Sequence, residues 1–120
     1  GKYVDVLPTI EGGRQGAGMV HHVAFQTPTD EEQLAMRKAA QSAGLRPTDQ
    51  IDRHWFRSVY FREFGGVLFE LATNVPGYDS DEPLDELGEQ LVLPGKFEGR
   101  REEIERRLAD VTVPRADADD

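Results

Sequence analysis

Two side chains attract attention because their chemistry conflicts with the pattern around them. His22 lies in the alternating run 19–25 and Glu70 in the run 67–73, and both runs read as strands. Glu70 shares a strand face with Leu68 and Ala72, where an unpaired buried carboxylate would cost several kcal/mol. An imidazole and a carboxylate are also donors that divalent metal ions accept in proteins. We therefore expect His22 and Glu70 to meet on one face of a sheet.

A third donor is missing from this picture. Iron in an open site requires at least one more protein ligand, as in the arrangement of two histidines and one carboxylate. His21 does not supply it, because alternation along a strand points adjacent side chains to opposite faces. A simpler alternative is that His22 is a hydrogen-bonded structural residue and that Glu70 faces water.

Other polar residues surround the expected meeting point. Tyr60 shares a strand face with Ser58 and Arg62, and Arg53 precedes that strand. A phenol or a guanidinium close to a metal ion can hold an anionic substrate oxygen or relay a proton. The alternative for these side chains is a wet sheet edge.

The elements that must position these side chains follow from periodicity and turn residues. Thr29 and Glu32 form a capping-box pattern at the start of a helix, and Gly44 offers its stop. Gly65 and Gly66 predict a hairpin. The expected order is a strand at 3–7, a glycine-rich connector at 11–18, a strand from 19, a helix at 30–43, and strands at 48–53, 56–63 and 67–73.

Two further expectations concern the helices. The mostly small apolar side of the first helix should pack on the sheet; it comprises Leu34, Met36, Ala39, Ala40 and Ala43. Beyond residue 76, leucines and other apolar residues at helical spacing predict acidic surface helices, with Glu102 and Arg106, and Glu103 and Arg107, as ion pairs. The last residues, 115–120, are expected to be disordered.

Composition restricts the class of protein. The chain of 120 residues suits one small domain, and it has no apolar run long enough to cross a membrane. It has no cysteine, which excludes disulfides and thiolate metal sites and fits a cytoplasmic protein. A net charge of −9 argues against nucleic acid as a partner.

Several motifs together resemble a known family. The runs 16–25, 51–53, 58–63 and 66–73, with Pro76-Gly77, resemble the C-terminal module of hydroquinone-type, extradiol ring-cleaving dioxygenases. These enzymes belong to the vicinal oxygen chelate, or glyoxalase/bleomycin resistance/dioxygenase, superfamily. The resemblance implies an α+β fold, a βαβββ module whose curved, mixed four-stranded sheet forms a half-cup. The module would span 19–75, after a closing strand and linker at 1–18 and before a helical extension at 76–112 and a disordered tail at 113–120.

The resemblance also implies roles for individual residues. His22 and Glu70 would be ligands of Fe(II), with Mn, Ni or Zn as alternative metals. His21, Arg53 and Tyr60 would be catalytic groups acting on a small aromatic substrate and dioxygen. The family commonly has Tyr where this chain has Trp55, a change that would reshape the pocket wall.

Family members are longer and contain several such modules. The resemblance therefore implies that this chain is a C-terminal part, whose missing metal ligand comes from an N-terminal module or whose site is completed in a homodimer. Two alternatives stay open. One is a glyoxalase-like isomerase or lyase that works as a homodimer with Ni or Zn, and the other is a metal-free binding module of the bleomycin-resistance type.

Overall fold

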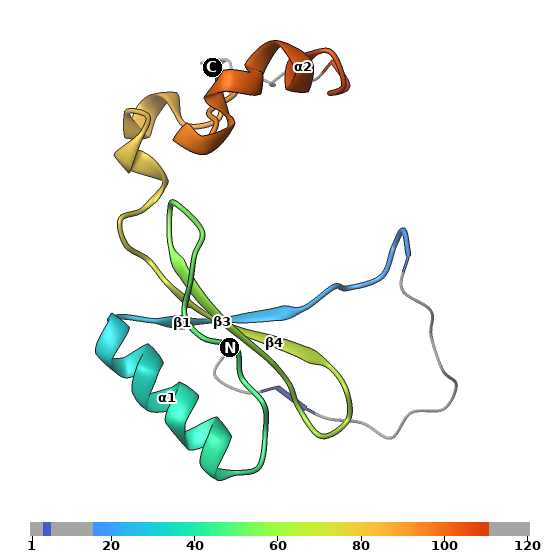
Figure 1. The fold of residues 1–120 in the computed structure, drawn as a ribbon, viewed down its shortest axis with the longest axis vertical. Coiled ribbons are helices and arrows are strands. Elements are labelled where there is room, and N and C mark those ends of the chain that lie inside the picture. The colour runs from blue at the N-terminus through green and yellow to red at the C-terminus, as the bar shows by residue number, and fades with distance from the viewer. Residues whose placement is uncertain (1–3, 6–15, 111–120) are drawn as a thin grey trace, which may run out of the picture.

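The computed structural model describes residues 4–5 and 16–110. Its centre is one mixed four-stranded sheet with the strand order β1-β4-β3-β2 (Figure 1). The strand β1 pairs in parallel with β4, whereas β3 pairs antiparallel with both β4 and β2. The predicted α+β class and the order of strand, helix and three strands are confirmed. The elements of this unit are β1 (Val23–Thr27), α1 (Asp30–Ser42), β2 (Ile51–Asp52), β3 (Arg57–Arg62) and β4 (Leu68–Thr73).

The predicted hairpin joins β3 to β4. Gly66 has a φ of 90°, which a residue without a Cβ adopts without strain. The Glu63 carboxylate accepts hydrogen bonds from the backbone amides of Gly65 at 2.7 Å and of Val67 at 2.8 Å. These two bonds hold the pKa of Glu63 below its ordinary value because they stabilise the charged form. The turn therefore depends partly on the ionisation of one glutamate.

The caps of α1 also follow the prediction. The hydroxyl of Thr29, the N-cap residue, accepts a hydrogen bond from the amide of Glu32 at 3.2 Å. At the other end Gly44 adopts a φ of 87°, and the amide of Leu45 donates to the carbonyl of Ala40 at 3.0 Å. The helix ends at Ser42, one residue before the predicted end.

One face of the sheet carries the apolar core. Val59 and Leu71 stand opposite each other in β3 and β4, and they are 0% and 3% exposed. Phe69 contacts the rings of Phe25 and Phe61 edge-on, with centroid distances of 5.1 and 5.8 Å. The helix α1 lies along this face and contacts β1, β3 and β4 (Figure 1). The opposite face is left for other functions.

The prediction for the buried side of α1 is wrong. Leu34 and Met36 are 46% and 45% exposed, whereas Gln33 is fully buried. Gln33 Nε2 donates to the carbonyls of Arg57 and Leu71, both at 2.8 Å, and its Oε1 accepts from Gln50 at 2.7 Å. The helix therefore docks through a polar side chain that satisfies main-chain carbonyls, a requirement that apolar periodicity does not reveal.

Two strands of the sheet begin more than one residue later than predicted. The strand expected at 48–53 is regular only at Ile51–Asp52, because the Thr48 hydroxyl accepts the hydrogen bond of the Tyr60 amide in place of a backbone carbonyl. The first strand begins at Val23, so the two histidines precede it. Of the strand predicted at 3–7, only Val4 and Asp5 are described, and they are not in a strand; the rest of it, and the tail at 113–120, lie outside the described residues.

The segment beyond residue 76 does not form the long helices that leucine spacing predicted. It contains η1 (Tyr78–Ser80), η2 (Leu84–Glu86), η3 (Gly95–Arg100) and α2 (Arg101–Glu105), of which the first three are 3₁₀ turns. Pro83 and Pro94 stand directly before two of these turns, and Gly88 has a φ of 82°, so the chain changes direction often. The pair of Glu103 with Arg107 forms at 2.9 Å, whereas Arg106 donates to the backbone carbonyl of Glu102.

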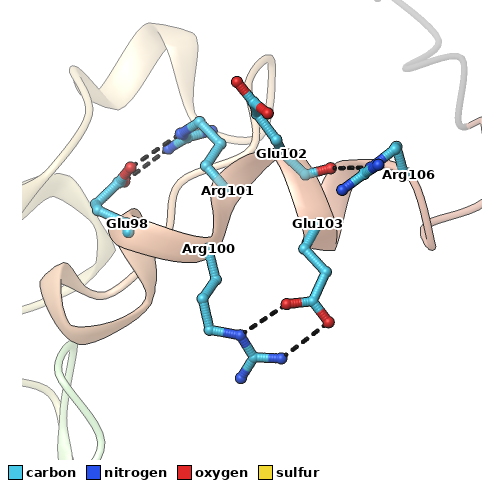
Figure 2. A pocket seen from close by; sticks show the side chains of 7 residues that line it. Glu98, Arg100, Arg101, Glu102, Glu103 and Arg106 are labelled. Atoms are coloured by element: carbon cyan, nitrogen blue, oxygen red, sulfur yellow. Dashed lines mark hydrogen bonds and ion pairs between the residues drawn. The ribbon is translucent and has the colours of Figure 1, made fainter.

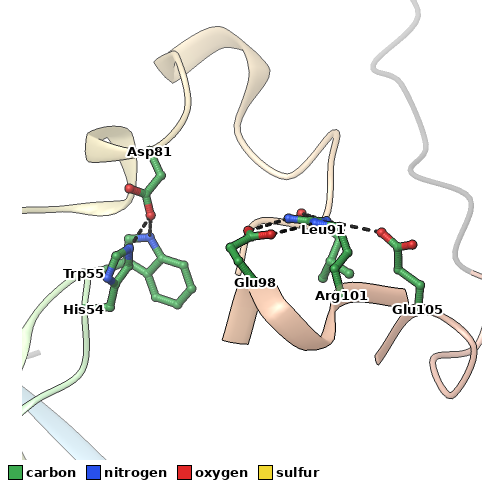
Figure 3. Close-up of polar contacts among 7 residues, drawn as sticks. All are labelled: His54, Trp55, Asp81, Leu91, Glu98, Arg101 and Glu105. Carbon is green, nitrogen blue, oxygen red and sulfur yellow. Dashed lines mark hydrogen bonds and ion pairs between the residues drawn. The ribbon is translucent and has the colours of Figure 1, made fainter. Parts of the chain in front are cut away.

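The C-terminal segment leads away from the end of the sheet (Figure 1). Polar and aromatic contacts connect it to the turn before β3. Asp81 Oδ2 lies 2.5 Å from His54 Nε2 and accepts a hydrogen bond from Trp55 Nε1 at 2.8 Å (Figure 3). The Trp55 ring also stacks on Tyr78, with centroids 5.4 Å apart. Among residues 4–5 and 16–110, no helix is both long enough and apolar enough to cross a membrane.

Replacing Gln33 with Leu should destabilise the chain by about 1–3 kcal/mol, because it leaves buried polar partners without a hydrogen bond. Urea denaturation followed by circular dichroism measures this difference. Gln41→Leu, at an exposed position of the same helix, is the matched control and should change the free energy of unfolding by less than about 0.5 kcal/mol. Equal effects of the two substitutions would contradict the polar docking of α1.

Glu63→Gln should lower the free energy of unfolding at neutral pH, and the difference from the wild type should shrink in acid. Because the pKa of Glu63 is depressed in the folded state, its contribution is fully present above the unfolded pKa and is lost as the pH falls through the folded pKa. Unfolding curves between pH 7 and pH 2 measure the effect. Glu89→Gln, at an exposed position outside the sheet, is the control. A difference that does not depend on pH would refute the role of the carboxylate.

Candidate metal centre

Three predicted residues, His22, Tyr60 and Glu70, meet on the face of the sheet opposite α1. Glu70 of β4 stands opposite Ala24 of β1 on one side and opposite Tyr60 of β3 on the other. His22 directly precedes β1, and its imidazole contacts the Glu70 carboxylate. Glu70 is only 3% exposed. The sheet therefore gathers an imidazole, a carboxylate and a phenol at one place.

The two oxygens of the Glu70 carboxylate have different partners. Oε2 lies 2.7 Å from Nε2 of His22. Oε1 accepts a hydrogen bond from the hydroxyl of Tyr60 at 2.9 Å and another from the hydroxyl of Ser58. Because charge-assisted hydrogen bonds offset the cost of burying a carboxylate, this arrangement explains how a strand in the middle of the sheet tolerates Glu70.

The prediction that the adjacent histidines point to opposite faces is wrong. Nδ1 of His21 and Nδ1 of His22 are 2.8 Å apart, and the two rings meet edge-on with centroids 5.1 Å apart. Alternation does not apply here because β1 begins only at Val23. One of the two Nδ1 atoms must carry the proton of this hydrogen bond, so the tautomers of the two imidazoles are linked.

Tyr60 has a raised pKa. Burial of the phenol raises the pKa most, and the hydrogen bond to Glu70 and the negative charge of Glu70 raise it further. A hydrogen bond with Ser58 and the positive charge of Arg53 act in the opposite direction. The phenol is therefore uncharged at neutral pH, and its hydroxyl donates a hydrogen bond to Glu70. Arg53 is exposed and influences the site through its charge.

His22 and Glu70 form a suitable pair of metal ligands. Donors that each bind a divalent ion at about 2.0–2.2 Å lie about 3 Å from each other, which is close to the observed separation of Nε2 and Oε2 of 2.7 Å. Residues 4–5 and 16–110 contain no group of three or more His, Cys, Asp or Glu side chains that could hold a metal ion. Within this part of the chain, His22 and Glu70 are therefore a pair of possible metal donors and not a group of three.

Sequence reasoning did not assign Ser58 to the site. Its hydroxyl is fully buried and contacts the same carboxylate oxygen as Tyr60 does. The signal was the spacing of two between Ser58 and Tyr60, which places both side chains on the face of β3 that meets Glu70. A serine is common on strands, and only the register makes this one specific.

Another polar hollow lies on the C-terminal segment and lacks these features (Figure 2). Its charged groups already pair with one another: Arg100 with Glu103 at 3.0 Å, and Arg101 with Glu98 at 2.7 Å. Arg101 also contacts Glu105 and donates to the carbonyl of Leu91 (Figure 3). Such exposed ion pairs are typical of a solvated surface and contribute little to stability.

Comparisons with known proteins identify relatives of this chain. Two curated relatives match most of the chain. One is "Putative ring-cleaving dioxygenase MhqO" of Bacillus subtilis, 41% identical over 98% of this chain and 38% of its own length. The other is "Chlorohydroquinone/hydroquinone 1,2-dioxygenase" of Sphingobium indicum, 33% identical over 82% of this chain and 30% of its own length. The chain thus spans about a third of the length of these relatives.

A solved structure and a family model complete the comparison. A crystal structure described as a putative dioxygenase from Bacillus subtilis matches 86% of this chain and 33% of its own with a TM-score of 0.82 and 42% identity. Residues 5–71 match the model of the Glyoxalase/Bleomycin resistance protein/Dioxygenase superfamily. This range contains the whole sheet except the last two residues of β4. The chain belongs to this superfamily.

Proposed function

We propose that this chain supplies two metal ligands, His22 and Glu70, to an Fe(II)-dependent ring-cleaving dioxygenase that acts on hydroquinone-like or catechol-like substrates. The observation that carries the proposal is the contact of 2.7 Å between His22 Nε2 and the buried Glu70 Oε2, with a protonated phenol beside it. The printed names of the relatives support the reaction class. Mn, Ni and Zn are the alternative metals.

The chemistry of the ligands follows from their hydrogen bonds. A bound Fe(II) ion would supply Lewis acidity, one-electron chemistry and open positions for substrate and dioxygen. For His22 to present the lone pair of Nε2 to the ion, its proton must be on Nδ1, where it can be donated to His21 Nδ1. His21 would therefore fix the tautomer and the ring orientation of His22.

Tyr60 and Arg53 are proposed to act on the substrate. The phenol holds a proton on its hydroxyl oxygen at neutral pH, where its raised pKa keeps it neutral as an ordinary tyrosine is, and it can give this proton to a substrate oxygen. Arg53 is exposed beside Tyr60, where a fixed positive charge would attract an anionic, deprotonated aromatic hydroxyl. Tyr60 lies beside Glu70 on the sheet, and Arg53 is close enough for its charge to act on the phenol.

The third metal ligand is proposed to come from another copy of this kind of module. The chain spans about a third of its relatives' length, and its described residues offer two ligands. A second module in a longer chain or a second copy of this chain in a homodimer could supply an imidazole. An isologous homodimer would bring two His22 and two Glu70 residues together.

A metal-free binding module is the second candidate. The observation that favours it is that Nε2 of His22 and Oε2 of Glu70 lie within hydrogen-bond distance of each other. In that case the polar face of the sheet would hold an organic ligand by hydrogen bonds. Metal analysis of the purified protein distinguishes the two candidates.

His22→Ala and Glu70→Ala should each abolish stoichiometric Fe(II) binding in the protein at its native length, because each removes one of the few protein ligands. Elemental analysis after anaerobic loading with Fe(II) measures the occupancy. The control is His54→Asn, which removes an imidazole from a different imidazole–carboxylate pair and keeps a residue type that tolerates the φ of 76° at this position. Full iron occupancy in His22→Ala or in Glu70→Ala would refute the assignment.

Tyr60→Phe should lower kcat/KM for oxygen consumption with hydroquinone by about 10²–10⁴-fold while iron stays bound, because the variant lacks the proton donor. An oxygen electrode measures the rate, and metal analysis verifies the iron content. Tyr78→Phe is the control, since Tyr78 is 58% exposed and stacks on Trp55 away from Glu70. An unchanged rate in iron-loaded Tyr60→Phe would exclude a catalytic role of the phenol.

A further inference from the structure

We propose that Ser58 is a positioning residue that restricts Glu70 to binding a metal ion through one oxygen, Oε2. This inference rests on the proposed metal-binding role of His22 and Glu70, and it adds a residue to which the family resemblance assigned no role. The hydroxyl of Ser58, together with that of Tyr60, occupies Oε1 of the carboxylate. The other oxygen is left facing His22.

The position of Ser58 is fixed by the sheet. Tyr60 stands directly opposite Glu70 in the β3–β4 register, and Ser58 stands opposite Ala72, one step along the same face. Residues two apart on one strand point to the same side, so both hydroxyls approach Glu70 from β3. His22 approaches the carboxylate from the β1 side. The donors to Oε1 and the partner of Oε2 therefore come from opposite sides of Glu70.

The lone pairs of the carboxylate explain the consequence. Each carboxylate oxygen accepts about two hydrogen bonds, and Oε1 already has two donors. A metal ion that bound both oxygens would have to displace at least one of these donors. Both donors are neutral hydroxyl groups, so neither adds a positive charge that would repel the ion. The arrangement favours a ligand that binds through one oxygen and leaves coordination positions open.

Ser58 and Tyr60 are not equivalent in this role. The side chain of Ser58 is fully buried, so its hydroxyl cannot exchange Glu70 for water. Tyr60 is half-buried and is the residue that we expect to contact the substrate. When the phenol turns towards a substrate oxygen, Ser58 still holds Oε1. Ser58 therefore keeps the carboxylate in place during the reaction.

A purely structural role for Ser58 makes a different prediction. In that case the serine would only offset the cost of burying Glu70, and its loss would lower stability without changing how a bound ion is coordinated. The distinguishing measurements are therefore the affinity for a metal ion and the coordination mode of Glu70. Zn²⁺ is a suitable probe because it is redox-inert and binds both imidazole and carboxylate.

The test compares Ser58→Ala with Thr27→Ala in the protein at its native length. Thr27 is also fully buried in the sheet, but its hydroxyl has no hydrogen-bond partner among the described residues, so its loss controls for destabilisation alone. Competition with a chelator gives the Zn²⁺ affinity, urea denaturation without metal gives the stability, and crystal structures with Zn²⁺ show which oxygens of Glu70 bind.

We expect Ser58→Ala to bind Zn²⁺ about 10–100-fold more weakly than the wild type and to coordinate it through both oxygens of Glu70. Thr27→Ala should keep the wild-type affinity, and Ser58→Thr should restore most of it because the hydroxyl is retained. If Ser58→Ala does not fold, Ser58→Cys, with similar volume and a weak S–H donor, should show the same loss of affinity.

Unchanged affinity together with coordination through Oε2 alone in Ser58→Ala or Ser58→Cys would overturn the proposal. Equal losses in Thr27→Ala would overturn it as well, because the effect would then be general destabilisation. A wild type that binds Zn²⁺ but never consumes oxygen when loaded with Fe(II) would refute the proposed reaction and leave the role of Ser58 intact. A wild type that binds no metal ion would refute both.

Discussion

The cost of burying one carboxylate organises this structure. Glu70 is 3% exposed on β4, which has a neighbouring strand on each side, and an unpaired charge at such a position would be strongly destabilising. Its three partners are His22, Ser58 and Tyr60, which come from the entry to β1 and from β3. The parallel pairing with β1 and the antiparallel pairing with β3 are therefore conditions for the site. The site in turn requires the register to be correct, because a shift by one residue would point Glu70 into the apolar core.

One face of the sheet carries the apolar core, and the other carries the candidate metal centre. Residues of β3 and β4 alternate between the core, with Val59 and Leu71, and the candidate metal centre, with Ser58 and Glu70. The core is small, and the helix that covers it docks through the amide of Gln33 rather than through leucines. Apolar side chains of α1, Leu34 and Met36 among them, are left exposed. The same strands carry both sets of side chains, so a change in the packing of the core is expected to shift the side chains of the candidate metal centre.

The extent of the comparisons bears on the function that we propose for the candidate metal centre. The superfamily model covers residues 5–71, and the chain spans about a third of the length of its curated relatives. In the function that we propose, His22 and Glu70 are a pair of ligands from one module, and a further ligand comes from another. The C-terminal segment is tied to the turn before β3 by Asp81, which contacts His54 and Trp55 (Figure 3). This contact places the segment beside Arg53, the charged residue next to the site.

Local sequence patterns predicted the elements of the sheet unit and drew attention to His22 and Glu70. The cap at Thr29, the glycine stop at Gly44, the hairpin at Gly66 and the misfit of Glu70 in an apolar strand are short-range signals, and each is confirmed. The structure also brought His22, Tyr60 and Glu70 together as expected. The superfamily suggested by the joint motifs is confirmed as well.

Only the tertiary structure decided how these parts meet. Alternation could not place His21, because the regular strand begins after both histidines and the chain there is free to bring the two rings together. Leucine spacing could not define the C-terminal helices, since prolines and glycines interrupt them. Gln33 bonds to carbonyls that are 24 and 38 positions further along the chain. Ser58 bonds to Glu70, which is 12 positions further along. Such contacts depend on strand order and register, which no local pattern specifies.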